Sequence, residues 1–275
     1  MVKKQIIKKM KIKKIKDKNI LVKHFRKNIP LNIYQLGDLD DFFFKFTEWF
    51  GLYESEGGEP EQVALLYKGS ELQVLLAFCD GKTDQMKILI EKIKADLPDK
   101  FYAHISPGLK DALLNDHEYE SGGRYLKMYL TKEKMEDHIK DSSDDNIRRM
   151  NASDLDDILK FYEKNYPGNW FDKRMLGTGK YFGYFDNDKI AGISGIHVYS
   201  KEYKVAALGN ITTGIEYRGK SVCTKLTSAL CSDLFETVDL IGLNVSESNV
   251  AAIRCYEKTG FKEYAGFEEC MFRKL

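Results

Sequence analysis

The feature that most constrains the fold of this 275-residue chain is the pattern of residues 205–261. A mostly apolar extended segment over 205–213 is followed by a turn of small and basic residues. Apolar positions at helical spacing come next, at Val222, Leu226, Ala229 and Leu230. A second strand is expected over 238–245 and a second helix over 249–259, which Gly260 ends. The pattern predicts a β-α-β-α unit.

The turn before the first predicted helix has the composition of an anion site. The first N–H groups of a helix lack partners, and the aligned peptide dipoles place partial positive charge there. Arg218 and Lys220 add two cations, while Gly219, Ser221 and Cys223 are small enough to let a diphosphate approach the backbone. The alternative is an ordinary strand-to-helix turn with solvated basic residues, and the Arg-Gly-Lys tripeptide alone does not decide between them.

Two motifs in this region resemble a known signature. Arg218-Gly-Lys-Ser-Val-Cys223 is followed by Asn249-Val-Ala-Ala-Ile-Arg-Cys-Tyr256-Glu-Lys-Thr-Gly-Phe261, in which Asn249 and Tyr256 lie two helical turns apart on one face. In this order and spacing they resemble the signature of the GNAT superfamily of N-acetyltransferases, over about residue 146 to the C-terminus. Ser221 stands where that family usually has glycine, and Cys223 where it usually has Gly or Ala.

The resemblance implies that acetyl-CoA lies between the strands over 205–213 and 238–245, which would splay apart. The first strand would pair with the pantetheine arm, and the basic turn would hold the diphosphate. Asn249 would bond the pantetheine, or it is only the N-cap of its helix. The cofactor-binding residues implied are Ile211, Thr212, Thr213, Arg218, Gly219, Lys220, Ser221, Val222, Cys223, Asn249 and Tyr256.

Catalytic candidates follow from the chemistry of acyl transfer, which needs a neutral amine and a proton for the departing thiolate. The resemblance makes Tyr256 the general acid, because an unperturbed phenol, with a pKa of about 10, keeps its proton at neutral pH. A packed aromatic is the alternative for Tyr256. His197 is a candidate base, although a histidine in an apolar strand is more often a buried structural residue; Glu216 or a water chain are other candidates. No metal site is expected.

The loop over 166–172 is too aromatic for a plain connector. In GNAT enzymes the equivalent loop flanks the acceptor pocket, so the resemblance makes Tyr166, Trp170 and Phe171 candidate substrate-binding walls. A hydrophobic plug over the core is the alternative.

Charge and element order suggest four parts. Residues 1–27 are a basic arm with twelve Lys or Arg and one acidic residue, while the rest of the chain is net acidic. Residues 28–135 are predicted to be a degenerate GNAT-like domain without the basic turn, 136–145 a linker, and 146–275 the acetyl-CoA-binding domain. The second half repeats the order of the first, with short matches at Asn32 and Asn146. The fold class predicted is α+β: two tandem GNAT-like domains, each with a mixed, mostly antiparallel sheet flanked by helices.

In the first half we expect a strand over 32–36, a helix over 39–50 and a short helix over 107–114. A hairpin is expected around Gly122 and Gly123, and a link between domains over 132–145. The arm either binds an anionic surface or packs its isoleucines, at positions 6, 7, 12 and 15, on the body.

The function predicted is an acetyl-CoA-dependent N-acetyltransferase that acts on a primary amine by direct attack in a ternary complex. One alternative is a catalytically silent acyl-CoA sensor or interaction module, and another is nucleic-acid binding through the arm, which is the less favoured. No apolar run suits a signal peptide or a membrane span. Five scattered cysteines are typical of reduced thiols in a cytoplasmic protein, and a homodimer is left open.

Overall fold

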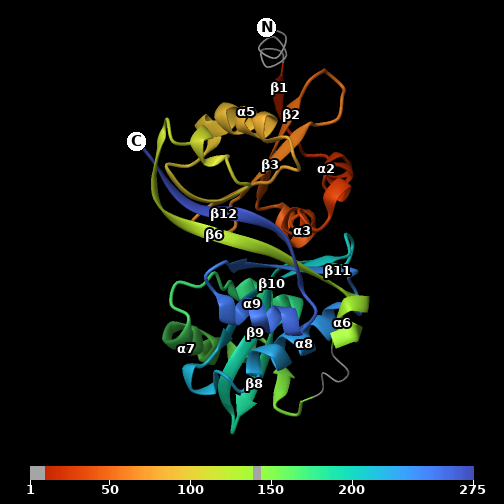
Figure 1. The fold of residues 1–275 in the computed structure, drawn as a ribbon, viewed down its shortest axis with the longest axis vertical. Helices are drawn as coiled ribbons and strands as arrows, with labels where there is room; N and C mark the ends of the chain where they lie inside the picture. The colour runs from red at the N-terminus through yellow and green to blue at the C-terminus, as the bar shows by residue number, and fades with distance from the viewer. Residues whose placement is uncertain (1–9, 139–143) are drawn as a thin grey trace. The chain divides into compact units, whose positions relative to one another are not determined.

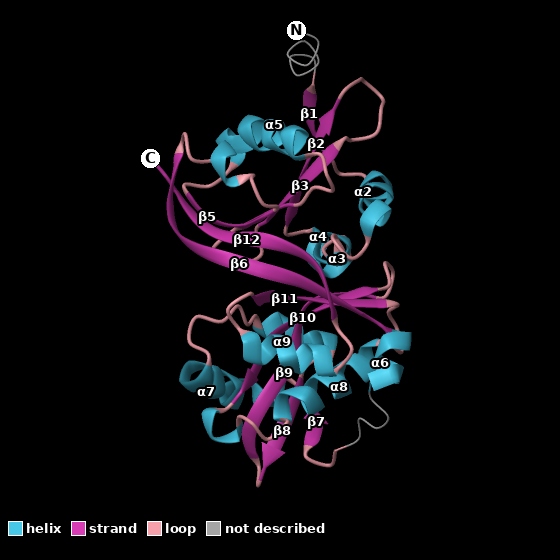
Figure 2. Ribbon diagram, viewed as in Figure 1, coloured by secondary structure: helices cyan, strands magenta, loops and turns pink. Residues whose placement is uncertain are grey.

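The computed structural model describes residues 10–138 and 144–275, and it divides into two compact units (Figure 1). The first unit comprises residues 1–126 with 265–275, and the second comprises residues 127–264. Strands flanked by helices build both units (Figure 2), which confirms the α+β class with a mixed sheet. Within the described residues, no helix has the length and apolar character needed to cross a membrane.

The strands of the first unit follow the order β1-β2-β3-β4-β5-β12-β6. Strands β4 and β5 pair in parallel, while the pairs β1–β2, β2–β3, β3–β4 and β5–β12 are antiparallel. The elements are β1 Lys11–Lys14, α2 Lys18–Phe25, α3 Ile33–Gly37, α4 Asp41–Phe44, β2 Thr47–Tyr53, β3 Gln62–Tyr67, β4 Val74–Ala77, α5 Thr83–Ile93, β5 Lys100–Ile105, β6 His117–Thr131 and β12 Lys262–Lys274, with short 3-10 turns at Arg26–Asn28, Lys94–Asp96 and Lys110–Ala112.

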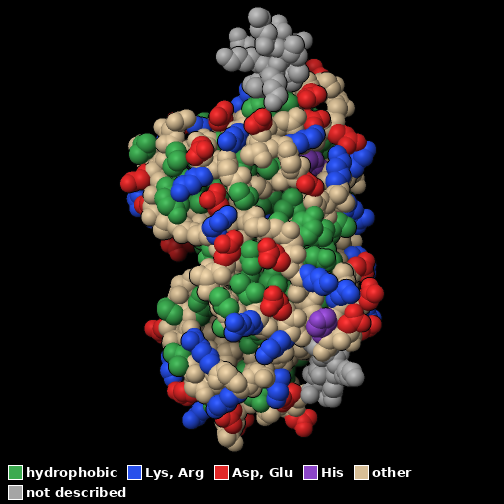
Figure 3. Space-filling model, in the orientation of Figure 1, with side chains coloured by type: hydrophobic (Ala, Val, Ile, Leu, Met, Phe, Trp, Pro, Cys, Tyr) green, Lys and Arg blue, Asp and Glu red, His purple; other side chains and the backbone are tan. Residues whose placement is uncertain are grey.

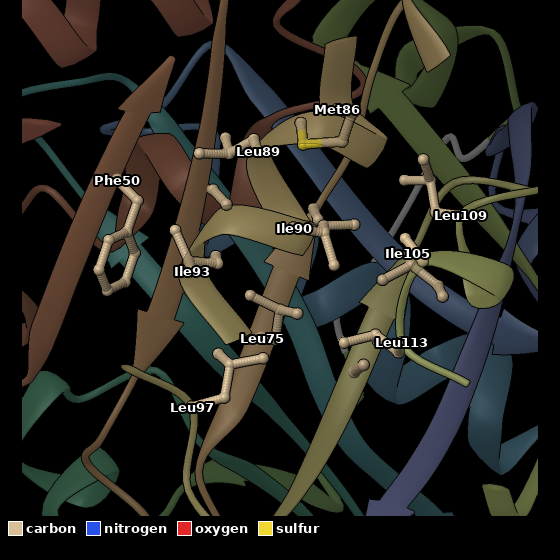
Figure 4. Close-up of a cluster of buried hydrophobic side chains, with 14 of the residues drawn as sticks. Phe50, Leu75, Met86, Leu89, Ile90, Ile93, Leu97, Ile105, Leu109 and Leu113 are labelled. Carbon is tan, nitrogen blue, oxygen red and sulfur yellow. The ribbon is translucent and has the colours of Figure 1, made fainter. Parts of the chain in front are cut away.

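The core of the first unit lies between α5 and the sheet (Figure 4). Helix α5 has its fully buried residues Met86, Leu89, Ile90 and Ile93 at helical spacing, so one face of the helix is apolar. This face packs on the inward side chains of β2, β3 and the neighbouring strands, and each fully buried aliphatic side chain contributes about 1.5–3 kcal/mol.

Strands β6 and β12 each pass from one unit into the other along the chain. Residues 117–126 of β6 and 265–274 of β12 belong to the first unit, and the remaining residues of both strands belong to the second. The predicted hairpin around Gly122 was wrong, because β6 runs straight through it. Gly122 is instead a point of close approach, since a Cβ there would overlap the backbone carbonyl of Glu269 on β12.

The described part of the basic arm, residues 10–27, is built into the first unit. Strand β1 pairs with β2, and Ile15, Leu21 and Phe25 are buried. Lysines of the arm form ion pairs with acidic residues of the same unit, among them Lys18 with Asp41 at 2.5 Å and Lys27 with Glu59 at 3.0 Å. Residues 10–27 therefore pack on the body of the first unit, which was one of the two alternatives for the arm. The isoleucines at 6 and 7 lie outside the described residues.

The strands of the second unit follow the order β6-β11-β10-β9-β8-β7. Helix α8 packs on β8, β9 and β10, and α7 packs on β9 and β10. The elements are α6 Lys132–His138, β7 Ile147–Arg149, α7 Leu155–Asn165, β8 Phe182–Asp186, β9 Lys189–Ser200, β10 Val205–Thr213, α8 Val222–Leu234, β11 Leu240–Ser246 and α9 Val250–Lys258, with 3-10 turns at Ala152–Asp154, Lys173–Thr178 and Ile215–Tyr217. The β-α-β-α pattern over 205–261 is thus confirmed.

The two units share an order of elements. A strand, a helix, an antiparallel run of three strands, a helix and a parallel strand occur as β1-α2-β2-β3-β4-α5-β5 and again as β7-α7-β8-β9-β10-α8-β11. The first copy begins at β1, inside the basic arm. The sequence matches at Asn32 and Asn146 do not mark equivalent positions, because Asn32 precedes a helix and Asn146 precedes a strand.

Several local predictions were wrong for identifiable reasons. Residues 33–37 form a short buried helix where a strand was expected, since a short apolar run does not distinguish the two. The helix expected over 39–50 ends at Phe44, and the aromatic residues that follow enter β2. Only residues 110–112 of the helix expected over 107–114 are helical, and part of the expected link is helix α6.

Candidate functional site

Strands β10 and β11 part after a short parallel ladder. Among the described residues the ladder joins Val205–Ala207 to Leu240–Gly242, although β10 continues to Thr213 and β11 to Ser246. The edge of β10 that faces β11 is therefore without a ladder partner over its last six residues, which include Ile211, Thr212 and Thr213. An open strand edge of this kind presents N–H and C=O groups to an extended ligand.

A β-bulge bends β10 within the open stretch. The pairing with β9 shifts between Gly209 and Thr212, where β10 carries one extra residue, and Asn210 adopts a left-handed backbone with φ 55°. Two buried tyrosines fix the bulge. The hydroxyl of Tyr162 on α7 donates to the carbonyl of Asn210 at 2.7 Å, and the amide of Asn210 donates to the hydroxyl of Tyr181 at 3.1 Å.

His197 lies at a second irregularity, in β9. The register shifts between Ala207 and Leu208 of β10, so that His197 is the extra residue on the opposite strand. Its ring covers Gly209, where a Cβ would overlap the imidazole. The side chain of His197 is half-buried, and Gly209, which its ring covers, is the residue at which the β10 bulge begins.

The basic turn leads into α8 without a side-chain cap. The first helical bond runs from Lys225 N to Ser221 O at 3.0 Å, so the N–H groups of Val222, Cys223 and Thr224 precede it. The backbone of this turn is left-handed at two residues, Gly219 with φ 76° and Ser221 with φ 62°. A Cβ on Gly219 would meet nothing within 4 Å, so the space in front of this glycine is open.

The cations of the turn are available to a ligand. Arg218 and Lys220 are exposed, and neither forms an ion pair with a described residue. The Lys220 ammonium lies 5.2 Å from the centre of the Tyr217 ring, whose hydroxyl donates to Asp186 at 3.0 Å. Two exposed cations beside N–H groups without a side-chain cap attract an anion.

Tyr256 lies on α9, which packs against α8, and Asn249 immediately precedes this helix. Tyr256 is buried, with 8% of its surface exposed, and its ring packs edge-on against Phe261 at 5.9 Å. The side chain of Asn249 accepts from Ala252 N at 3.2 Å, so the residue caps the helix, as one of the two interpretations expected. The cap occupies only the carbonyl oxygen of this exposed amide.

The aromatic side chains of the loop over 166–172 differ in exposure: two are exposed and one is packed against other rings. Tyr166 and Trp170 are 42% and 40% exposed. The ring of Phe171 instead packs between Tyr162 and Tyr181, with ring centres 5.4 and 5.5 Å away. Phe171 thus belongs to the aromatic cluster that supports the β10 bulge.

Three buried polar atoms near the open strands have no partner among the described residues. They are the hydroxyls of Thr212 and Thr213 on β10 and the side-chain carbonyl of Asn244 on β11. A buried polar atom without a hydrogen bond costs about 1–3 kcal/mol, which a bound ligand can recover. The open strand edge, the small residues and the basic turn fit an extended ligand that carries an anionic group.

Sequence reasoning missed the residues that shape this site. Tyr162, Tyr181 and Asn210 hold the bulge, and Asn244 lies on the parted strand. A signal existed for two of them: Gly209-Asn210 interrupts an apolar strand in the manner of a bulge, and Asn244 interrupts another. The two tyrosines had no comparable signal, because only the fold brings them to Asn210.

Part of this chain is similar in sequence to a known protein family. Residues 146–261 match the family model described as acetyltransferase (GNAT) family. Residues 146–261 form a GNAT domain. No match was found among curated proteins.

Solved structures extend the likeness in fold beyond the GNAT domain. A GNAT-family acetyltransferase from Colwellia psychrerythraea is 16% identical, with a TM-score of 0.58 over 96% of this chain and 100% of that chain. A Drosophila protein is 10% identical, with a TM-score of 0.75 over 96% and 98%. A tandem GNAT protein from the clavulanic acid biosynthesis pathway is 11% identical, with a TM-score of 0.55 over 96% and 97%. The fold of most of the chain is therefore that of GNAT proteins.

The first unit lacks the opening that the GNAT domain has. Strand β4 pairs with β5 along its whole length, from Val74↔Tyr102 to Ala77↔Ile105. Two further bonds extend the closure, from Ser106 N to Ala77 O at 3.1 Å and from Cys79 N to the Ser106 hydroxyl at 3.0 Å. The first unit therefore offers no open strand edge at the position equivalent to β10 and β11.

Proposed function

We propose that the GNAT domain transfers an acetyl group from acetyl-CoA to a primary amine by direct attack in a ternary complex. The observation that carries the proposal is the open edge of β10, followed by a turn into an uncapped helix, with two cations that form no ion pair with a described residue. This is the arrangement that a pantetheine arm followed by a diphosphate requires.

Two sets of residues would bind acetyl-CoA, one for the pantetheine arm and one for the diphosphate. The main chain of Ile211 and Thr213 would pair with the amides of the pantetheine as an added strand does, with the orphan threonine hydroxyls beside it. The N–H groups of Val222 and Cys223, together with Arg218 and Lys220, would hold the diphosphate. Asn249 keeps its amide N–H₂ for a further bond while its oxygen caps α9.

The catalytic roles are those that the family signature implies for these residues. Bound acetyl-CoA supplies the activated acyl group as a thioester. A backbone N–H at the bulge of β10 would polarise the carbonyl, because the bulge turns amides away from the ladder with β9. Tyr256 would give its phenolic proton to the departing thiolate. His197, Glu216 or a water would take the proton of the attacking amine, and Tyr166 and Trp170 would contact the acceptor.

A second candidate, an acyl-CoA sensor without turnover, is favoured by one observation. Ser221 holds the left-handed backbone, φ 62°, that suits glycine, and glycine is the usual residue at this position of the motif. A side chain here narrows the approach to the helix N-terminus. The sensor and the enzyme share the same binding site and differ only in chemistry.

Thioester turnover separates the two candidates. The full-length protein is incubated with acetyl-CoA and a panel of primary amines, namely small polyamines, amino acids, aminoglycosides and peptides, and free CoA thiol is measured. Release that depends on the amine and yields acetylated product supports the enzyme. CoA binding by calorimetry with no amine-dependent release across the panel contradicts it in favour of the sensor.

A further inference from the structure

Two thiols meet where α8 begins. Cys223 is the second residue of α8 and Cys255 lies on α9, and their sulfur atoms are 2.6 Å apart. Cys223 is partly exposed and Cys255 is buried with 9% of its surface exposed. All five cysteines lie within the described residues, and all are free thiols, so this contact joins two reduced side chains.

We propose that Cys223 and Cys255 are an oxidative modification site, which closes reversibly into a disulfide. A disulfide requires about 2.0 Å between the sulfur atoms, so closing the bond needs a shift of about half an ångström from the observed contact. Helices α8 and α9 are already packed together, and the two residues are 32 positions apart in the chain. The bond would therefore tie together elements that are neighbours in the fold.

The surroundings of the pair favour a thiolate on Cys255. Contact with the Cys223 thiol lowers the pKa of Cys255, and a hydroxyl of Thr224, 3.5 Å from the Cys255 sulfur, acts in the same direction. The same contact and burial raise the pKa of Cys223. A thiolate is the nucleophile in thiol oxidation, so Cys255 is the residue that reacts first.

The oxidant required is a peroxide, and the reaction balances with one equivalent. The Cys255 thiolate attacks one oxygen of hydrogen peroxide, the O–O bond breaks, and the leaving hydroxide takes up a proton to become water. Cys223 loses its proton and attacks the resulting sulfenic sulfur, whose S–O bond breaks to release a second water after protonation. Two thiols and one peroxide thus yield one disulfide and two waters.

The consequence for the cofactor rests on the proposed function. The N–H of Cys223 belongs to the expected diphosphate site, and Cys255 immediately precedes Tyr256. The disulfide would fix the first turn of α8 to the residue before the general acid. We expect oxidation to weaken CoA binding at least tenfold, and bound CoA, which covers the turn, to slow oxidation.

The test uses the full-length reduced protein treated with one equivalent of hydrogen peroxide. The expected result is a loss of two titratable thiols from the five, an intact mass lower by two hydrogens, a Cys223–Cys255 linked peptide in a non-reducing digest, and full reversal by dithiothreitol. Cys223→Ser and Cys255→Ser should each abolish the linked peptide. Cys79→Ser and Cys231→Ser are the matched controls and should leave it unchanged; thermal melts verify that each variant is folded.

The proposal is overturned if peroxide only adds oxygen to the cysteines, or if the linked peptide joins other cysteines or two chains. These measurements do not depend on CoA, so the disulfide is decided even if the reduced protein fails to bind CoA and the proposed function falls. If the disulfide forms and CoA affinity is unchanged, the link between oxidation and the cofactor is wrong.

Discussion

Tyr256 and the turn around Ser221 are the residues on which the account of the site depends. Tyr256 packs against Phe261 and is largely buried, so its ring has a structural role whatever the hydroxyl does. The chemistry of the hydroxyl can therefore be tested separately from the packing of the ring.

Replacing Tyr256 by Phe removes the hydroxyl and keeps the ring in place. We expect kcat for amine acetylation to fall by about 100-fold or more, which is the usual contribution of a general acid, while the dissociation constant for CoA changes less than threefold. Steady-state kinetics and calorimetry measure the two quantities. Tyr264→Phe, at a 40% exposed tyrosine on β12, is the control and should leave both unchanged. A Tyr256→Phe enzyme with wild-type kcat would remove Tyr256 from the mechanism.

His24 makes the stability of the first unit depend on pH. Burial lowers the pKa of His24 to about 4, so the folded protein holds this side chain neutral while the unfolded chain binds a proton below pH 6.5. Its contribution to stability is complete above pH 6.5 and is lost as the pH falls toward 4. The shift corresponds to at most ~3 kcal/mol.

Denaturant unfolding of the first unit at pH 7.5 and pH 4.5 measures this effect. The wild-type protein should lose more unfolding free energy between the two pH values than His24→Gln, whose side chain does not titrate. Equal losses in the two proteins would mean that His24 does not titrate with a depressed pKa.

At the scale of elements, the bulge in β10 lies within the stretch that has no ladder partner on β11 among the described residues. Tyr162 on α7 holds the bulge by its bond to the carbonyl of Asn210. The bond is buried, so losing it leaves the carbonyl without a partner.

Tyr162→Phe should lower the unfolding free energy of the GNAT domain by about 1–3 kcal/mol and reduce kcat, because the amides of the bulge lose their fixed positions. Tyr199→Phe is the matched control: it removes a bond of 2.8 Å to Thr237 at the other end of β9, away from the bulge. It should lower stability without the loss of kcat. Equal kinetic effects in both variants would contradict a specific role for the bulge.

The elements also show what the sequence can and cannot predict. The β-α-β-α unit over 205–261 follows from periodicity and turn residues. The β8–β9 hairpin turns at Asn187 and Asp188, and both have the left-handed backbone that such a hairpin uses. The glycines of β6 misled the prediction, because a glycine placed for close approach has the same sequence signal as one placed for a turn. The bonds from Tyr162 and Tyr181 to Asn210 depend on tertiary contacts that no local pattern contains.

At the scale of the whole molecule, the first unit is built from two separate stretches of the sequence. The last residues of the chain belong to the first unit, where β12 pairs with β5. Phe272 is fully buried there and stacks on Phe101 with ring centres 5.6 Å apart. On the face drawn in Figure 3, basic and acidic side chains are intermixed.

Phe272→Ala should therefore destabilise the first unit, by about 3–5 kcal/mol as expected for a buried phenylalanine. Hydrogen exchange with mass spectrometry would show faster exchange in α5 and β2–β5. The exposed neighbour Leu275, mutated to Ala, is the control and should change nothing. Faster exchange confined to residues 127–264 would contradict the assignment of the C-terminal strand to the first unit.

The turn before α8 is proposed to bind the diphosphate of CoA, and among the described residues the pairing of β4 with β5 leaves one such site. Calorimetric titration of the reduced full-length protein with CoA tests it most directly. We expect one CoA per chain, and an affinity at least tenfold lower for Arg218→Ala/Lys220→Ala at the same ionic strength, with Lys258→Ala/Lys262→Ala, which removes two exposed cations elsewhere, as the control. No heat of binding, or equal affinity in wild type and the Arg218→Ala/Lys220→Ala variant, would contradict the account.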